Sequence, residues 1–389
     1  MEPDEVLERR VAQAKLFSET APGTLMGTLL RQFWHPIARA DTLARGQARA
    51  IRMLSEDLTL YRGESGEYHL VGDHCAHRGT VLRTGWVEGE DLRCMYHGWR
   101  YDGTGLCNEI PAEKQPRPRP VRIAGYPTRQ YAGLVFAYMG EGAAPAFELP
   151  RKEAFEDPSR HLVALEQTWD CGWFQQIENS LDPLHIRFAH KWGKSTHYGD
   201  ARQMTSTPDL SYTETASGVR QRATTKTTDR ISDWTFPNNN HLVVPGEKKD
   251  EPWSEICAWT VAVDDQTTRR FRVYSFATAE QARRVAEGDR DYDPADHYEA
   301  LFDARHPDHQ KVMDVADLQF FTAQDYVAMR GQGRMADRVN ENLSVSDAGV
   351  LFLRRLFLRE MEAIRNGQPT KHWAAEKVEL PVQAAEGAG

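Results

Sequence analysis

The feature that most constrains this chain is a short segment with two pairs of metal-binding side chains. Cys75-x-His77 is followed, after sixteen intervening residues, by Cys94-x-x-His97, in a chain with only five cysteines. A cysteine with a histidine two or three positions away can present both side chains from one turn, so two such turns can hold one metal centre. The spacing therefore predicts a metal site that brings residues 75–77 and 94–97 together.

Two kinds of metal centre fit these four residues. One is a structural zinc held by two cysteines and two histidines. The other is a Rieske centre, a [2Fe-2S] cluster in which two histidines replace two thiolates on one iron. Zinc sites usually group a cysteine pair and then a histidine pair, whereas each turn here supplies one of each. This grouping favours the cluster, with Cys75 and Cys94 on one iron and His77 and His97 on the other, and leaves zinc as the alternative.

A second group of candidate ligands lies in "IENSLDPLHIRFAH", residues 177–190, which contains Asp182, His185 and His190. Two imidazoles and one carboxylate are the usual ligands of non-heme Fe(II). On an unbroken helix, residues five apart point about 140° from each other, so the two histidines could share a metal only where the helix breaks or ends. Pro183 indicates such a break, and Asp182-Pro183 is typical of a helix N-cap and first residue. The alternative is an ordinary helix start with two surface histidines.

The chain offers three candidates for a third ligand in a helical stretch near its C-terminal end. Asp314, Asp317 and Asp325 all lie there among apolar residues. Spacing does not separate them, because each could equally be a solvated residue of the helix.

Several segments resemble one family. "CAHRGT" (75–80) with "CMYHGW" (94–99) resembles the Rieske domain of ring-hydroxylating non-heme iron oxygenases, and Asp-x-x-His-x-x-x-x-His is similar to that family's iron signature. "PGTLMGTLLRQFWHP" (22–36) and "AQDYVAMRGQGRMADRVNENLSVSD" (323–347) resemble segments of its phthalate-dioxygenase-type α subunits. The resemblance covers nearly the whole chain.

The resemblance implies a role for each candidate residue. His185 and His190 bind iron, and the Gln-Asp segment makes Asp325 the third ligand. Asp182 is a bridging residue whose carboxylate accepts a hydrogen bond from His185 and another from a cluster histidine.

The resemblance, together with the pattern of short β segments and helical stretches along the chain, predicts an α+β protein. Short β segments separated by turns fill residues 38–147, the expected all-β Rieske [2Fe-2S] domain, and the Pro- and Ala-containing stretch 140–150 is the expected boundary. Residues 1–37 should form a helical segment that packs on the catalytic domain. Residues 148–389 should form that domain, an antiparallel sheet covered by helices (helix-grip, START-like), with a helical segment at 168–190 and a loose tail from about 370.

The family also implies a function. The chain would be the terminal oxygenase of a system in which an NAD(P)H-dependent reductase, of flavin or ferredoxin type, passes electrons through the [2Fe-2S] cluster to mononuclear Fe(II). There O2 is activated to hydroxylate or O-/N-dealkylate a small aromatic substrate, with or without a carboxylate. A homotrimer, or stacked trimers, would bring the cluster of one subunit near the iron of the next. The alternatives are a Rieske electron carrier without oxygenase activity and a zinc-stabilised binding module.

The composition limits the classes of partner that the protein is expected to bind. A net charge of −9 argues against non-specific nucleic-acid binding. No apolar run reaches the roughly 20 residues that span a bilayer, so no membrane partner is expected. Few cysteines are typical of a cytoplasmic protein.

The sequence does not identify the substrate. A carboxylate substrate would need a buried cluster of Arg, Lys or amide groups. The candidates are Arg202, Asn238, Asn239, Asn240 and His241. A solvated loop is the simpler interpretation of each, and we assign none of them to a site.

Overall fold

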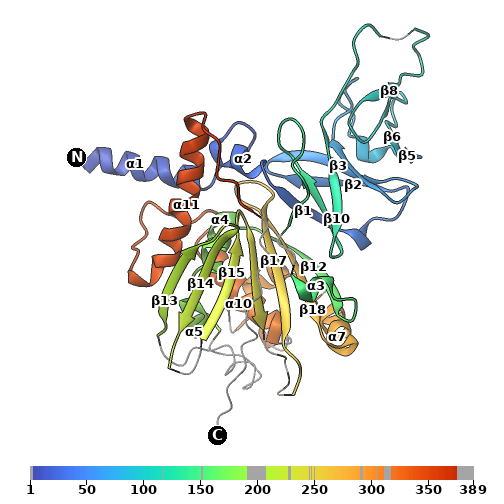
Figure 1. The fold of residues 1–389 in the computed structure, drawn as a ribbon. Helices are drawn as coiled ribbons and strands as arrows, with labels where there is room; N and C mark the ends of the chain where they lie inside the picture. The colour runs from blue at the N-terminus through green and yellow to red at the C-terminus, as the bar shows by residue number, and fades with distance from the viewer. Residues whose placement is uncertain are drawn as a thin grey trace. The chain divides into compact units, whose positions relative to one another are not determined.

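The chain folds into two compact units (Figure 1). The computed structural model describes residues 3–115, 117–149, 152–190, 207–226, 229–244, 246, 248, 250–289, 292–303, 305–310 and 317–374. The small unit comprises residues 20–23 and 27–147, and the large unit comprises residues 1–19, 24–26 and 148–389.

The small unit is built from β-strands. They form three antiparallel sheets, ordered β1-β11-β10, β2-β3-β4-β9 and β5-β6-β7-β8. The strands are β1 (Trp34–Arg39), β2 (Ala48–Met53), β3 (Glu56–Arg62), β4 (Tyr68–Gly72), β5 (Trp86–Glu88), β6 (Asp91–Arg93), β7 (Arg100–Tyr101), β8 (Cys107–Glu109), β9 (Gly125–Tyr126), β10 (Thr128–Tyr131) and β11 (Leu134–Tyr138). The expected all-β domain is therefore confirmed.

The segment before these sheets divides differently from our expectation. We expected residues 1–37 to form one helical segment that packs on the catalytic domain, but residues 20–23 and 27–37 belong to the small unit. The reason is strand pairing: β1 begins at Trp34, is buried along its length and pairs with the buried strand β11. Helix α2 (Leu25–Leu30) spans the division, and helix α1 (Pro3–Leu16) belongs to the large unit.

The large unit contains one seven-stranded antiparallel sheet. Its order is β12-β18-β17-β16-β15-β14-β13, so that the first strand of the unit lies at one edge, next to the last. The strands are β12 (His161–Trp169), β13 (Asp209–Glu214), β14 (Gly218–Thr224), β15 (Asp229–Thr235), β16 (Asn239–Val244), β17 (Ser254–Ala262) and β18 (Thr268–Phe276). This sheet with its helices confirms the predicted fold class.

Helices cover one face of this sheet (Figure 1). Among the described residues, the α-helices of the unit besides α1 are α3 (Glu153–Glu156), α4 (Trp173–Ser180), α5 (Leu184–Ala189), α7 (Ala279–Asp289), α8 (Tyr298–Phe302), α10 (Asp317–Gly331) and α11 (Ala348–Arg365). Tyr274 and Phe276 of β18 pack against Ala282 and Val285 of α7, and Arg272 on the same strand face donates to Thr322 of α10. A ligand-sized space can therefore lie between sheet and helices.

The helical segment predicted at 168–190 was wrong at its start. Residues up to Trp169 belong to β12, in which Val163, Leu165, Gln167 and Trp169 are buried at alternate positions. This period of two is the pattern of a strand with one buried face. Helix α4 begins only at Trp173. In the described part of the chain, no helix is both long and apolar enough to cross a membrane.

Candidate metal centres

The two cysteine–histidine segments of the small unit form loops with the same backbone pattern. In each loop the N–H of a glycine donates to the carbonyl of the cysteine four residues earlier, at 2.9 Å for Gly79 and 3.1 Å for Gly98. The N–H of Cys75 and that of Cys94 each donate to the carbonyl five residues on, at 2.9 and 2.8 Å. Both glycines have positive φ, 74° and 71°, a conformation that costs glycine little. The two loops are thus closed in the same way, although histidine stands at different positions in them.

The four donors are divided by their exposure. Cys75 and Cys94 are only 3% and 1% exposed, and neither forms a disulfide. Burial raises the pKa of the Cys94 thiol, and the neighbouring Cys75 thiol raises it further. His77 and His97 are exposed, with ring centroids 4.5 Å apart. One side of the site is therefore a buried thiol pair and the other is an imidazole pair at the surface.

Two aromatic residues that the sequence analysis did not single out support this site. The Tyr101 hydroxyl lies 3.1 Å from Cys75 Sγ and accepts the N–H of Ala76 at 3.1 Å. The Trp99 ring stacks on His77 at 4.8 Å, with an interplanar angle of 5°. The alternation in "WRY" was the available signal, because Trp99 directly precedes β7 (Arg100–Tyr101) and residues two apart in an extended chain point to the same side.

The distances between donors favour the cluster over zinc. A tetrahedral zinc holds its ligand atoms about 3.8 Å or less from one another. Among the described residues, the only group of three or more His, Cys, Asp or Glu with all donor atoms within 4.8 Å is His185, His190 and Asp325. No three of the four donors in the small unit meet that distance. A wider spacing, with sulfur donors on one side and nitrogen donors on the other, suits a two-iron cluster.

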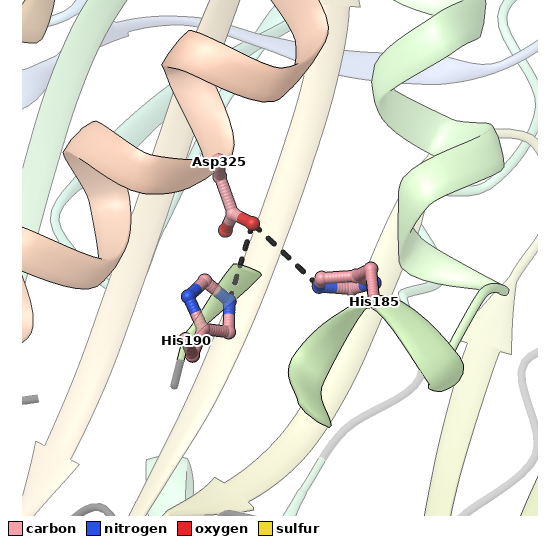
Figure 2. Close-up of side chains that lie close together, drawn as sticks. All are labelled: His185, His190 and Asp325. Carbon is pink, nitrogen blue, oxygen red and sulfur yellow. Dashed lines mark ion pairs between the residues drawn. The ribbon is translucent and has the colours of Figure 1, made fainter. Parts of the chain in front are cut away.

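The large unit brings two histidines and one aspartate together (Figure 2). Asp325 Oδ1 lies 3.6 Å from His185 Nε2 and 3.3 Å from His190 Nε2. The two imidazole centroids are 5.3 Å apart. Asp325 projects from α10 between the two rings, so a single ion can contact one atom of each side chain.

The helix break that these histidines require is present. Helix α4 ends at Ser180, and the short helix α5 begins only at Leu184, after Pro183. Helix α5 ends at Ala189, so His190 is its C-cap, with φ −99° and ψ 21°. His190 therefore lies outside the helical geometry of α5, and its ring can turn toward His185.

The outer nitrogen of each imidazole faces an acceptor. His190 Nδ1 lies 3.0 Å from Gln324 Oε1, and His185 Nδ1 forms a short hydrogen bond with the backbone carbonyl of Asp182. Such contacts orient a metal-binding imidazole and leave Nε2 free for the metal. Gln324 was not singled out from the sequence, although it stands next to Asp325.

Asp182 acts on His185 differently from our prediction. We expected its carboxylate to accept the imidazole N–H, but the backbone carbonyl does so. The carboxylate Oδ1 instead accepts the N–H of Leu184 at 3.1 Å. The reason is the helix start: α5 begins with an N–H that lacks a helical partner, and the side chain two residues earlier satisfies it.

Electrostatics prepare the three donors for a cation. Burial opposes ionisation of Asp325, but His190, His185 and Arg270 outweigh it, so that the pKa of this carboxyl lies below its ordinary value. Burial lowers the pKa of His185 to about 4. The site therefore presents one carboxylate and a neutral imidazole at neutral pH, the protonation states that metal binding requires.

The other two candidates for the third ligand are not part of this group of donors. Asp314 lies outside the described residues, and Asp317 is the first residue of α10, more than two turns before Asp325. Asp325 itself lies between the buried residues Phe321 and Met329 on the same helix.

A cavity of about 120 Å³ adjoins the three donors. It lies between the sheet and the helices and is lined by Asn240, Ala258, Thr260, Arg270, Arg272 and Tyr274 of the sheet as well as by the donors. Of the polar residues we considered for a substrate, Asn240 lines it and Arg202 lies outside the described residues. The side-chain amides of Asn238 and Asn239 donate to strand carbonyls, and His241 contacts Glu255.

Comparisons with known proteins agree with these donor sets. Residues 33–131 match the model of the Rieske [2Fe-2S] domain. The 5,5'-dehydrodivanillate O-demethylase oxygenase subunit of Sphingobium sp. is 34% identical over 372 residues, which cover 91% of this chain and 81% of the relative. The chain belongs to the Rieske non-heme iron oxygenases.

Other relatives place this Rieske oxygenase among the oxygenase subunits. The phenoxybenzoate dioxygenase subunit alpha of Ectopseudomonas oleovorans is 30% identical, covering 90% of this chain and 85% of the relative. In fold, the chain is similar to a solved structure of the NdmA QL mutant with theobromine from Pseudomonas putida. The TM-score is 0.66 at 21% identity, covering 87% of this chain and 92% of that one. The cofactors of the Rieske oxygenase family are a Rieske [2Fe-2S] cluster and a mononuclear iron. The two donor sets of this chain fit them in number and kind.

Proposed function

We propose that this chain is the terminal oxygenase that hydroxylates or O-/N-dealkylates a small aromatic molecule. The observation that carries the proposal is the presence, in one chain, of two donor sets of different chemistry. Relatives named as an O-demethylase, a phenoxybenzoate dioxygenase and a methylxanthine N1-demethylase support the substrate class and the reaction.

Each donor set has its own task in this proposal. Cys75 and Cys94 hold one iron of the cluster from the protein interior, while His77 and His97 hold the other at the surface. The exposed imidazole side is the side from which electrons can enter and leave, because short separation favours electron exchange between proteins.

His185, His190 and Asp325 hold the mononuclear Fe(II). Two imidazoles and one carboxylate leave coordination positions free for O2. When bound, the cluster supplies single electrons and Fe(II) activates O2 beside the substrate. The protein orients both imidazoles through their outer nitrogens and provides a cavity between sheet and helices for the substrate.

Asp182 is proposed as the link between the two centres. One carboxylate oxygen accepts the N–H of Leu184, and the other is available to a cluster histidine, His77 or His97, of a neighbouring subunit. This arrangement requires an oligomer, and a homotrimer or a pair of stacked trimers provides one such neighbour for every subunit.

A partner protein supplies the electrons. Relatives are named as oxygenase subunits, and a solved structure with a TM-score of 0.64 and 20% identity is an oxygenase and ferredoxin complex of carbazole 1,9a-dioxygenase. We propose an NAD(P)H-dependent reductase with a flavin or ferredoxin centre for this chain.

Iron content and turnover test the proposal together. The purified protein should hold about three irons per chain and give a Rieske EPR signal when reduced, whereas an electron carrier would hold about two. After reduction and exposure to O2, a panel of aryl ethers and aromatic acids should give a hydroxylated or dealkylated product. A full iron content without any product from this panel would contradict the aromatic oxygenase function.

A further inference from the structure

Two arginines on one strand line the cavity but are held differently. Arg270 and Arg272 are two apart on β18 and therefore point to the same face of the sheet. Arg272 is buried, and its Nη1 donates to the Tyr274 hydroxyl at 3.2 Å and to Thr322 Oγ1 at 2.9 Å. Arg270 Cζ lies 4.1 Å from the ring centroid of Trp169. In the part of the chain that the structure describes, the Arg270 guanidinium has no hydrogen bond or ion pair.

The strand beside these arginines leaves room over them. On β17, Thr260 pairs with Arg270 and Ala258 pairs with Arg272, and both small side chains line the cavity. The cavity measures about 120 Å³, and an engineered protein cavity of roughly 150 Å³ accepts benzene. The space therefore suits about one aromatic ring, with the Arg270 guanidinium at its wall.

Charged side chains of both signs line the cavity. They are Arg230, Arg270 and Arg272 as cations and Asp182 and Asp325 as anions. A bound divalent iron adds positive charge to this lining. Positive charge in a partly buried site is costly unless an anion compensates it.

Arg270 could instead serve only as a counter-ion for Asp325. Its contacts argue against this limited role, because Asp325 Oδ1 is already approached by His185, His190 and the Asn179 amide, and Arg270 makes no hydrogen bond to it. A guanidinium has five N–H donors in a planar fork that matches a carboxylate.

We propose that Arg270 binds a carboxylate of the substrate, so that the substrate is an aromatic acid held with its ring in the cavity beside His185, His190 and Asp325. The inference rests on the proposed function, since it assumes that this cavity receives the substrate. Arg272 is not assigned to the carboxylate, because its guanidinium already donates to Tyr274 of the same strand and to Thr322 of α10.

Binding measurements on the iron-loaded protein test this assignment without turnover. The probes are 4-methoxybenzoate and its uncharged, equally shaped amide, 4-methoxybenzamide, titrated by anaerobic calorimetry. We expect the wild type to bind the acid at least about tenfold more tightly than the amide. Arg270→Gln should weaken acid binding by about 10- to 100-fold, the usual loss for a charge-assisted bond, and leave amide binding within about twofold.

Two further variants separate recognition from general damage. Arg270→Lys keeps the charge without the planar fork and should recover part of the preference for the acid. Arg269→Gln is the matched control, because Arg269 is the adjacent residue of β18 and contacts Glu166 at 3.5 Å on the other face. Its acid affinity should equal that of the wild type, and all variants should keep their iron.

Every outcome decides between the alternatives. Equal binding of acid and amide by the wild type, no acid binding at millimolar concentration, or an unchanged preference in Arg270→Gln would overturn the assignment. Acid preference that depends on Arg270, without any oxygenated product, would retain the anion site and reject the oxygenase function. Product from neutral aryl ethers alone would reject the anion site and retain the oxygenase function.

Discussion

The two candidate metal sites are built in opposite ways. The site of the small unit takes all four donors from residues 75–97, on two loops closed by the same hydrogen bonds and by a glycine at positive φ. The site of the large unit takes donors from residues 185–190 and from Asp325, which meet only because α5 and α10 lie on the same side of the sheet. One site is specified by local backbone geometry and the other by tertiary packing.

The difference also extends to how the imidazoles are held. His77 and His97 are exposed and are supported mainly by neighbouring rings, as in the stacking of Trp99 on His77. His185 and His190 each have a hydrogen-bond acceptor at Nδ1. The large-unit site is therefore oriented before metal binds, whereas we expect the exposed imidazoles to gain their final orientation from the cluster. This comparison predicts that each site can be lost without the other.

The largest effect is expected from removing a cluster donor. His77→Ala should abolish the visible Rieske spectrum and the activity, and lower the iron content from about three to about one per chain. The remaining iron should stay at the large unit, whose donors do not depend on residues 75–97. Met95→Ala, an exposed position in the second loop, is the control and should keep its colour. An unchanged spectrum in His77→Ala would remove the Rieske assignment.

Removing the distant donor should have the complementary effect. Asp325→Ala should lose the mononuclear iron and all activity while the cluster spectrum stays the same, because the carboxylate is the only anionic donor of that site. Iron analysis and absorbance on one sample measure both. The exposed Asp337→Ala serves as the control. Wild-type iron content in Asp325→Ala would return the role of third ligand to Asp317 or Asp314.

This contrast explains how far the sequence could be interpreted. The loop donors and the all-β domain were predictable because the relevant residues are close in the chain. The helix break near Pro183 was also predictable, since proline acts locally. Asp325 needed a resemblance, because no local pattern separates it from Asp314 and Asp317.

Two features of the large unit were not predictable from the residue pattern. The acceptor for His185 proved to be a backbone carbonyl, which no sequence pattern identifies. Arg270 and Arg272 also went unnoticed, although a period of two within "RRFRVYSF" indicates a strand face with two positive charges. What was missing was the knowledge that helices cover that face.

Substitution of Asp182 should lower activity less than the loss of a metal donor does. It is the most specific test of the link between the two sites. Asp182→Asn keeps the carbonyl that faces His185 and an oxygen that can accept the N–H of Leu184. It removes the negative charge and places an NH2 donor where a cluster imidazole needs an acceptor. Both metals should remain, while the product of a single turnover of pre-reduced enzyme should fall by about 100-fold. Near-normal product would limit Asp182 to its contacts at the start of α5.

The smallest effect separates backbone strain from steric contact in the two loops. Alanine at Gly79 or at Gly98 must adopt positive φ, which costs about 1–2 kcal/mol for a residue with a side chain. A Cβ at Gly79 would meet no atom within 4 Å, whereas one at Gly98 would lie 3.1 Å from Pro111 Cγ. Gly98→Ala therefore adds a close contact to the same conformational cost.

We expect both variants to lose their cluster colour at a lower temperature than the wild type, with Gly98→Ala affected more. Iron at His185, His190 and Asp325 should be retained in both variants, because that site does not depend on either loop. Equal melting of the two variants would mean that Pro111 yields without cost and that strain alone governs the loops. If the mononuclear iron were lost along with the cluster colour, the two sites would not be independent, and the contrast between local and tertiary construction would fail.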